Sequence, residues 1–582
     1  MKEDKIKIDT YLQDPFVAAQ DPDLAFVELE FSKYLNLSDG PTSPRFAVVD
    51  YNGNIEELAS PAVWDADRKK FRKGKGVNST IINQNQKDSH YFHQVNVWAI
   101  LENALAFYEG PNGMGRRIPW GFDSNRLIVV PHAGYGKNAF YDRTSKSLQF
   151  YFYKDGDEMV YTCLSADIIR HEFGHAILDG IRPYYIEGYD VQTGAFHEFI
   201  GDFSAILILF RNSPFRHKLA EQTAGNLDQK TYLSSIAEQF GDTVKDRPYL
   251  RTATSELTIP DLDKPENEDR RDSPHFVSNV MTGTMYQILI EIAKIYIEER
   301  ERTAVQSLAY NIDRMQRTLL QPIDFLPPVD VNFKDYARAV LRYQQLSDPL
   351  DPYDYYKTIL EVFVARGILS ENEGEELLEK KYLFDRNILN FKYQPNIEKL
   401  IESPEAAYVF LDQHREELGI PKHIDFKVMQ PYTARKNMRQ NLRRPPQYVL
   451  QYVWREEIPL DGNFGALEGE IITLLCGGTL VLDDFGRVLS WMLKPGSKVT
   501  EYQPQGIARK ERFLEIMQRH IHSGRLNLEA AEIDQGLIGK RQAPLAIRQT
   551  KSGLEIINAP HMHIDEEADH HDKGTRQWEL SF

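Results

Sequence analysis

The segment DIIRHEFGHAILDG, residues 167–180, most constrains the fold, because it places polar and charged side chains inside an otherwise apolar helix. Its apolar residues recur at three- and four-residue intervals without proline, which predicts a mostly buried helix ending near Gly180. On that helix His171 and His175 lie one turn apart on one face, with Glu172 beside them. Burying these groups is costly unless something binds them, so the fold has to supply a partner.

The spacing of these residues is the HExxH arrangement of zinc sites, in which two histidines bind one ion and the glutamate acts as a general base. HExxH also arises by chance, but a chance occurrence more often lies on a charged, solvated helix face. The apolar surroundings of this segment therefore favour a metal site. A zinc site of this kind needs a third protein ligand and a position left for water.

A second apolar segment, GAFHEFIGDFSAILILF from Gly194, offers the third ligand. Glu198 and Asp202 lie one turn apart on the same face of this predicted helix. Glu198 would complete a site of two histidines and one glutamate, and Asp202 would accept the free ring proton of a ligating histidine. The alternative is an ordinary helix with a polar stripe.

HEFGHAILD followed by GAFHEFIGDFSA resembles the thermolysin family of zinc peptidases, the gluzincins. The resemblance runs in the family's order from about residue 86 to about residue 370, through YGKNAFYDRTSKSLQFYFYKDG, YLRTATSE, DSPHFVSNVMTGTMY and FKDYARAVLRYQQL. It implies an α+β fold with two lobes. A β-rich lobe would end in the HExxH helix, a mainly helical lobe would carry Glu198 and His275, and the metal would lie in the cleft between them.

The resemblance also assigns roles to single residues. His275 matches the family's transition-state-binding histidine, and Tyr184 and Tyr185 are both candidates for its oxyanion-binding tyrosine. The residues that would contact substrate are Asn138 and Ala139 on an edge strand, Ile168 and Leu250 in the pocket after the cleaved bond, and Arg251 at a substrate carbonyl.

The sequence departs from the family pattern at three positions. His197 precedes the third ligand where the family usually has asparagine. Leu209 stands where the paired calcium site needs a carboxylate, so calcium is not expected there. Arg270 stands where an aspartate orients the downstream histidine, and Asp269 and Asp272 are the candidate substitutes.

Residues and resemblance together predict a zinc endopeptidase with one catalytic Zn²⁺ held by His171, His175 and Glu198. The ion would lower the pKa of a bound water, and Glu172 would take the water's proton and pass it to the leaving amine. His275 would stabilise the oxyanion. An apolar residue is expected after the cleaved bond.

Two alternatives remain. A zinc-stabilised module on a peptidase fold, latent or non-catalytic, would keep the metal ligands but has no use for a general base, so the presence of Glu172 favours the enzyme. A zinc aminopeptidase would need a group that captures a free amino terminus, and the sequence identifies none.

With 582 residues, of which 42% are hydrophobic, the chain is long enough for several domains. We expect an N-terminal extension, partly β, at 1–85, a β-rich peptidase lobe at 86–192, a helical lobe at 193–370 and an accessory α+β domain at 371–582. Turn signals predict a hairpin in PRFAVVDYNGNIEEL and strands in QYVLQYVW and GTLVLDDFGRVLSWML. The polar segment after residue 558 reads as a mobile tail that carries His561, His563, His570 and His571.

The net charge of -17 argues against nucleic-acid binding, so the expected partners are a peptide or protein substrate and a docking partner for the C-terminal domain. Cys163 and Cys476 lie in different expected domains, and we expect both to be thiols. There is no N-terminal apolar signal region and no transmembrane run. This predicts a cytoplasmic protein, or else one exported without an N-terminal signal, for instance as an injected effector.

Overall fold

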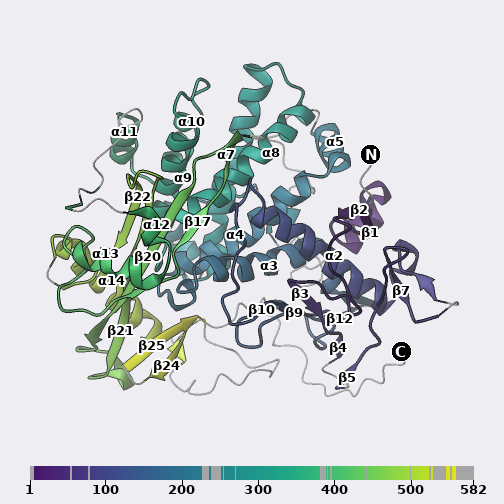
Figure 1. Ribbon diagram of the computed structural model, residues 1–582, viewed down its shortest axis with the longest axis horizontal. Helices are drawn as coiled ribbons and strands as arrows, with labels where there is room; N and C mark the ends of the chain where they lie inside the picture. Colours follow the sequence, from purple (N-terminus) through teal and green to yellow (C-terminus); the bar gives the residue numbers. More distant parts are fainter. Residues whose placement is uncertain are drawn as a thin grey trace.

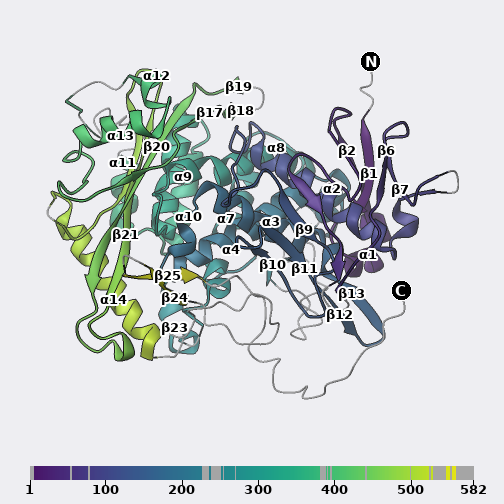
Figure 2. The same ribbon diagram turned by 60° about the horizontal axis from the view of Figure 1, so that its bottom comes forward.

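The helices and sheets are segregated, which confirms the expected α+β class (Figure 1). Long strands stand at one end of the molecule and small sheets at the other, with most helices between them (Figures 1 and 2). The computed structural model describes residues 5–52, 56–76, 79–223, 225, 235–236, 251–252, 254–268, 270–379, 389, 391–392, 396–439, 442–498, 500–522, 526–527, 545–550 and 553–558. Outside these residues lie Leu250, Asp269, His561, His563, His570 and His571.

The N-terminal part forms two small antiparallel sheets against a long helix. Aromatic rings of Tyr11, Phe26 and Phe92 pack together across this contact, with centroids 4.6 to 6.3 Å apart. The alternating burial of IKIDTY places the apolar face of its strand on the helix. These elements are β1 (Ile6–Tyr11), α1 (Pro15–Gln20), β2 (Phe26–Phe31), β6 (Val63–Asp65), β7 (Lys70–Lys73), β8 (Thr80–Ile81) and α2 (His90–Glu109).

A four-stranded sheet with the order β10-β11-β9-β3 lies beside the helices. The β3–β9 and β9–β11 pairs are parallel, whereas the β10–β11 pair is antiparallel and leaves β10 at the edge. Its strands are β3 (Phe46–Val48), β9 (Leu127–Val130), β10 (Ala139–Asp142) and β11 (Ser147–Phe150). The hairpin of β12 (Phe152–Asp155) and β13 (Glu158–Tyr161) then leads through η3 (Thr162–Leu164) to the HExxH helix.

A strand before the expected boundary at residue 85 pairs with a strand after it. β3 belongs to the same sheet as β9, and Phe46 packs against Trp120 and Phe173, with centroids 6.0 and 5.5 Å away. The predicted hairpin does form, as β4 (Tyr51–Asn52) pairs with β5 (Glu57–Leu58), but the segment before it joins the central sheet. Parallel pairing joins distant segments, and no local turn signal marks it.

Buried helices form the centre of the molecule, and one hydrophobic core contains residues between Ile6 and Leu369 together with Val449 and Val481 of the C-terminal part. The helix predicted at 167–180 is confirmed as α3 (Ala166–Ile181), in which Ser165 caps the first turn by accepting from the Ile168 amide. The other helices of this part are α4 (Val191–Phe210), α5 (Ser213–Gln222), α7 (Pro274–Glu298), α8 (Ala304–Leu320), α9 (Phe333–Ser347) and α10 (Tyr355–Ala365).

Among the described residues, α4 is the helix that is long and apolar enough to cross a membrane by length and composition. The whole of its apolar window is buried inside the protein. Its apolarity is that of a core helix, and it packs against α3, α5, α7 and α8.

The C-terminal part has its own core and a sheet of eight described strands. The predicted strands at 447–454 and 478–493 are confirmed: β20 pairs along its length with β21, and the turn at Asp483 returns the chain into β22. The elements are α11 (Glu371–Glu379), α12 (Ile397–Leu400), α13 (Pro404–Gln413), β16 (Lys427–Val428), β17 (Tyr432–Ala434), β18 (Asn437–Arg439), β19 (Leu442–Arg443), β20 (Gln447–Pro459), β21 (Ile471–Leu482), β22 (Val488–Lys494), α14 (Gln503–His522), β23 (Leu526–Asn527), β24 (Leu545–Thr550) and β25 (Gly553–Asn558).

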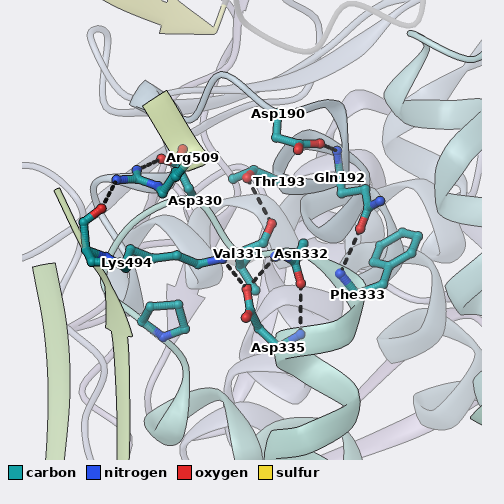
Figure 3. Close-up of polar contacts among 12 residues, drawn as sticks. Asp190, Gln192, Thr193, Asp330, Val331, Asn332, Phe333, Asp335, Lys494 and Arg509 are labelled. Atoms are coloured by element: carbon teal, nitrogen blue, oxygen red, sulfur yellow. Dashed lines mark hydrogen bonds and ion pairs between the residues drawn. The ribbon is translucent and has the colours of Figure 1, made fainter. Parts of the chain in front are cut away.

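Ion pairs join this C-terminal part to the loop that precedes α9 and to the first turn of α9 (Figure 3). Arg509 of α14 pairs with Asp330, and both side chains are almost fully buried. The Lys494 ammonium lies 2.6 Å from a carboxylate oxygen of Asp335. The two parts of the chain are therefore fixed to each other by charged groups removed from solvent.

The same loop contacts the first turn of α4 (Figure 3). The Thr193 hydroxyl donates to the Val331 carbonyl at 2.9 Å, and the Phe333 amide donates to the Gln192 side chain at 2.9 Å. Asp190 caps α4 by accepting from the Gln192 amide. The loop thus connects the C-terminal part to the start of the helix that carries Glu198.

Candidate metal centre

The helices α3 and α4 approach each other most closely where two glycines meet. A Cβ on Gly174 would lie 2.7 Å from the Gly201 Cα, and a Cβ on Gly201 would lie 2.8 Å from Nδ1 of His171. These separations are shorter than any real Cβ contact, so only glycine permits this packing. The close approach brings the histidines of α3 within reach of Glu198 on α4.

Three side chains bring four possible ligand atoms together at this crossing. Nε2 of His171 lies 3.1 Å from Nε2 of His175 and 3.4 Å from Oε2 of Glu198, and Nε2 of His175 lies 3.7 Å from Oε1 of Glu198. Atoms bound at about 2.0–2.2 Å to one tetrahedral ion lie roughly 3.3–3.6 Å from each other. One of the three distances lies inside this range and the other two lie within about 0.2 Å of it, so the three buried side chains could close around a single small metal ion.

Asp202 fixes the orientation of one ligand. Its Oδ1 lies 2.8 Å from Nδ1 of His171, opposite the nitrogen that faces Glu198. A carboxylate accepts the ring proton at Nδ1, which leaves the lone pair of Nε2 directed at the ligand cluster. The arrangement is the one expected from the Glu-x-x-x-Asp spacing.

Glu172 lies with the two histidines in a buried group whose ligand atoms are all within 4.8 Å of one another. Its side chain is fully buried. A carboxylate in this position is close enough to the metal ligands to exchange a proton with a water molecule held there.

His275 faces the same cluster from α7. Its Nε2 lies 3.3 Å from Oε2 of Glu198, and a third of its side chain is exposed, whereas Glu198 is fully buried. His275 therefore lies on the open side of the site. Of its two candidate orienting groups, Asp272 accepts from Arg519 of α14 at 2.8 Å, and Asp269 lies outside the described residues. Arg270, which occupies the expected aspartate position, lies over the Phe276 ring.

The expected substrate strand is an edge strand. β10 begins at Ala139 and pairs only with β11 within the described sheet. The Asn138 side chain accepts from the Ala139 amide at 2.9 Å and is nearly buried, while Ile168 is buried in the first turn of α3. Arg251 begins the short strand β15 (Arg251–Thr252), which pairs with β14 (Ser235–Ile236).

The two candidate tyrosines differ in their surroundings. Tyr185 is fully buried, and its hydroxyl donates to the Pro327 carbonyl at 2.9 Å. Tyr184 is half-buried and packs against an apolar cluster of Val329, Val453 and Leu475.

Sequence reasoning missed the contacts that hold β10 against α3. The Tyr141 hydroxyl donates to Oδ2 of Asp179 at 2.7 Å, and Nε of Arg143 donates to the same oxygen at 2.9 Å. Burial and the adjacent Asp179 raise the pKa of Tyr141, so its hydroxyl stays protonated and donates. Asp179 comes one turn after His175 on the same helix face, and this four-residue spacing indicates that Asp179 lies near the site.

His197 lies beside the metal ligands. Its ring is buried, 5.9 Å from the ring of His175 and 6.3 Å from that of Tyr185, between centroids. The histidine that replaces the expected asparagine is thus part of the wall of the site.

No protein-family model matches the chain, and no curated protein is significantly similar to it. The function is therefore argued from the residues of the site and their geometry.

Proposed function

We propose that the protein is a zinc-dependent endopeptidase. The observation that carries the proposal is the convergence of His171, His175 and Glu198 at 3.1 to 3.7 Å between ligand atoms, in a buried site next to Glu172. In this proposal residues 86–370 form a thermolysin-like pair of lobes with the site between them.

The donor set supports zinc as the metal. Two imidazole nitrogens and one carboxylate oxygen form one of the ligand sets of hydrolytic zinc sites, which keep a further position for water. Zinc bound there would polarise the scissile carbonyl and lower the pKa of the attacking water. His171 is already oriented for binding by Asp202, which reduces the reorganisation needed.

The chain's own residues carry the proton transfers and position the substrate. Glu172 takes the proton of the attacking water and delivers it to the leaving amine. His275, on the exposed side of the cluster, donates a hydrogen bond to the developing oxyanion. The free edge of β10 pairs with the substrate main chain, and Ile168 lines a pocket that selects an apolar residue after the cleaved bond.

The first prediction concerns Glu172. Purified full-length protein should cleave a quenched fluorescent peptide library before apolar residues, and Glu172→Gln should reduce the cleavage rate by about 10²–10⁴-fold because the proton acceptor is lost. Both proteins should contain the same amount of catalytic zinc, measured by elemental analysis, since Glu172 is not a ligand in the proposal.

Three other outcomes would contradict this function. Preference for charged residues after the cleaved bond would exclude the apolar pocket. Removal of amino-terminal residues alone would identify an aminopeptidase. If both proteins bind zinc and neither cleaves, the protein is latent or a binding module.

A further inference from the structure

A second cluster of metal-ligating side chains lies apart from the HExxH helix. His93 of α2, His132 after β9 and Cys163 in η3 each offer one ligand atom, and these atoms all lie within 4.8 Å of one another. All three side chains are buried, with 3%, 7% and 0% of their surface exposed. The proposed peptidase chemistry uses none of them.

The topology explains why these residues meet. β3 and β9 are parallel neighbours, so their carboxyl ends lie at the same edge of the sheet. Asp50 follows β3 by two residues, and His132 follows β9 by two residues. His93 lies in the first turn of α2, which reaches this edge. Cys163 lies in η3, the short segment just before α3.

The outer nitrogens of both imidazoles are held by oxygen acceptors. Nδ1 of His132 lies 2.7 Å from Oδ1 of Asp50, and Nε2 of His93 lies 3.1 Å from the Lys87 carbonyl. The other oxygen of Asp50, Oδ2, accepts from the Gln94 side-chain amide at 2.7 Å, so both carboxylate oxygens act as acceptors. Each outer nitrogen therefore carries the ring proton, as in metal-bound histidines with oriented rings.

This arrangement leaves the two inner nitrogens facing each other. Nδ1 of His93 and Nε2 of His132 are 2.9 Å apart, and in neutral rings with the outer protons in place both present lone pairs. Two acceptors in contact repel unless a proton or a cation lies between them. The thiol of Cys163, within reach of both nitrogens, favours a metal ion over a proton.

We propose that His93, His132 and Cys163 bind a second zinc ion, which has a structural role. One thiolate and two imidazoles form a donor set that suits zinc, with a water molecule as the fourth ligand. On binding, Cys163 releases its thiol proton to solvent and binds as the thiolate. The ion would connect α2, through His93, and the end of β9, through His132, to Cys163, three residues before α3 begins. The end of β3 would be linked indirectly, through the contact of Asp50 with His132.

The test uses zinc-saturated, full-length protein. We expect about two zinc ions per chain and a zinc–sulfur distance of about 2.3 Å in the X-ray absorption spectrum. The proposed catalytic site contains no sulfur, so this signal reports the second site alone. Cys163→Ser should remove the sulfur signal and one zinc, whereas Cys476→Ser, which changes the other buried thiol, should leave both unchanged.

His171→Ala separates the two sites. It should remove one zinc and retain the zinc–sulfur signal, so failure of the peptidase proposal would not affect this result. The second site is overturned if the zinc-saturated wild-type protein shows no sulfur ligand, or if the His171→Ala protein binds no zinc. The wild-type spectrum decides the question even if Cys163→Ser does not fold.

Discussion

At the scale of single residues, the candidate metal centre is organised by side chains that are not themselves proposed ligands. Asp202 contacts Nδ1 of His171 at 2.8 Å, and both side chains are buried. Asp50 has the same relation to His132 in the second cluster. In both cases a carboxylate determines which nitrogen of the imidazole carries the lone pair that faces the ligand atoms.

Replacing Asp202 should therefore weaken zinc binding. We expect Asp202→Ala to lower zinc affinity by about 10–100-fold, because His171 loses its orienting acceptor. Asp202→Asn should lower zinc affinity by a smaller factor, because the amide oxygen still accepts a hydrogen bond from His171. Competition with a fluorescent chelator measures both. Unchanged affinity in Asp202→Ala would show that the contact does not orient the ligand.

At the scale of elements, the site depends on how closely α3 and α4 pack. The helices touch at Gly174 and Gly201, so each position excludes even a methyl group. A wider crossing would separate Glu198 from the histidines by more than a shared ion can span, because ligand distances at zinc are short. The glycine in the middle of HEFGH is thus a packing requirement of the site.

Gly201→Ala tests this packing. The added methyl would meet Nδ1 of His171 at 2.8 Å, and we expect a loss of about 1–3 kcal/mol in unfolding free energy together with weaker zinc binding. Gly374→Ala is the comparison variant: its methyl would meet a side-chain methyl of the partly buried Val364 at 2.8 Å but no backbone atom, and helix propensity favours alanine by about 1 kcal/mol. Thermal or denaturant unfolding compares them. Equal stability of the two variants would contradict the packing argument.

At the scale of the whole molecule, the C-terminal part contacts the elements that support the candidate metal centre through buried charged groups. The Asp330 and Arg509 side chains are 6% and 9% exposed. Burial raises the pKa of Asp330 even with Arg509 beside it. Removal of either side chain would leave the other one charged and unpaired inside the protein. An unpaired buried charge destabilises the fold much more than the loss of a surface ion pair does.

Arg509→Ala should lower the unfolding free energy by about 3–5 kcal/mol at neutral pH. The loss of unfolding free energy in Arg509→Ala should become smaller as pH falls. Without Arg509, the pKa of Asp330 in the folded protein rises further above its value in the unfolded chain, so at low pH the folded state binds a proton there and the buried charge is removed. Arg512→Ala is the control: its side chain is 57% exposed, so loss of its pair with Asp190 should cost about 1 kcal/mol or less. Denaturant unfolding at several pH values measures both. A pH-independent deficit would contradict the assignment of the loss to Asp330.

The local structure of this protein could be predicted from sequence, because it depends on neighbours within one or two turns. The apolar period of residues 167–180 predicts α3, and the four-residue spacings place His171 with His175 and Glu198 with Asp202. Alternation and turn residues likewise predict the strands of the C-terminal sheet. The α+β class follows from the same local signals.

The sequence by itself thus determined the helices, the strands and the pairs of residues within one helix turn. Only the tertiary structure decided which distant segments meet. It paired β3 with β9 across the expected boundary at residue 85, set Gly201 against His171, and brought His132 to Cys163. The physical reason is that such contacts depend on packing between segments far apart in the chain, and no periodicity within either segment records its partner.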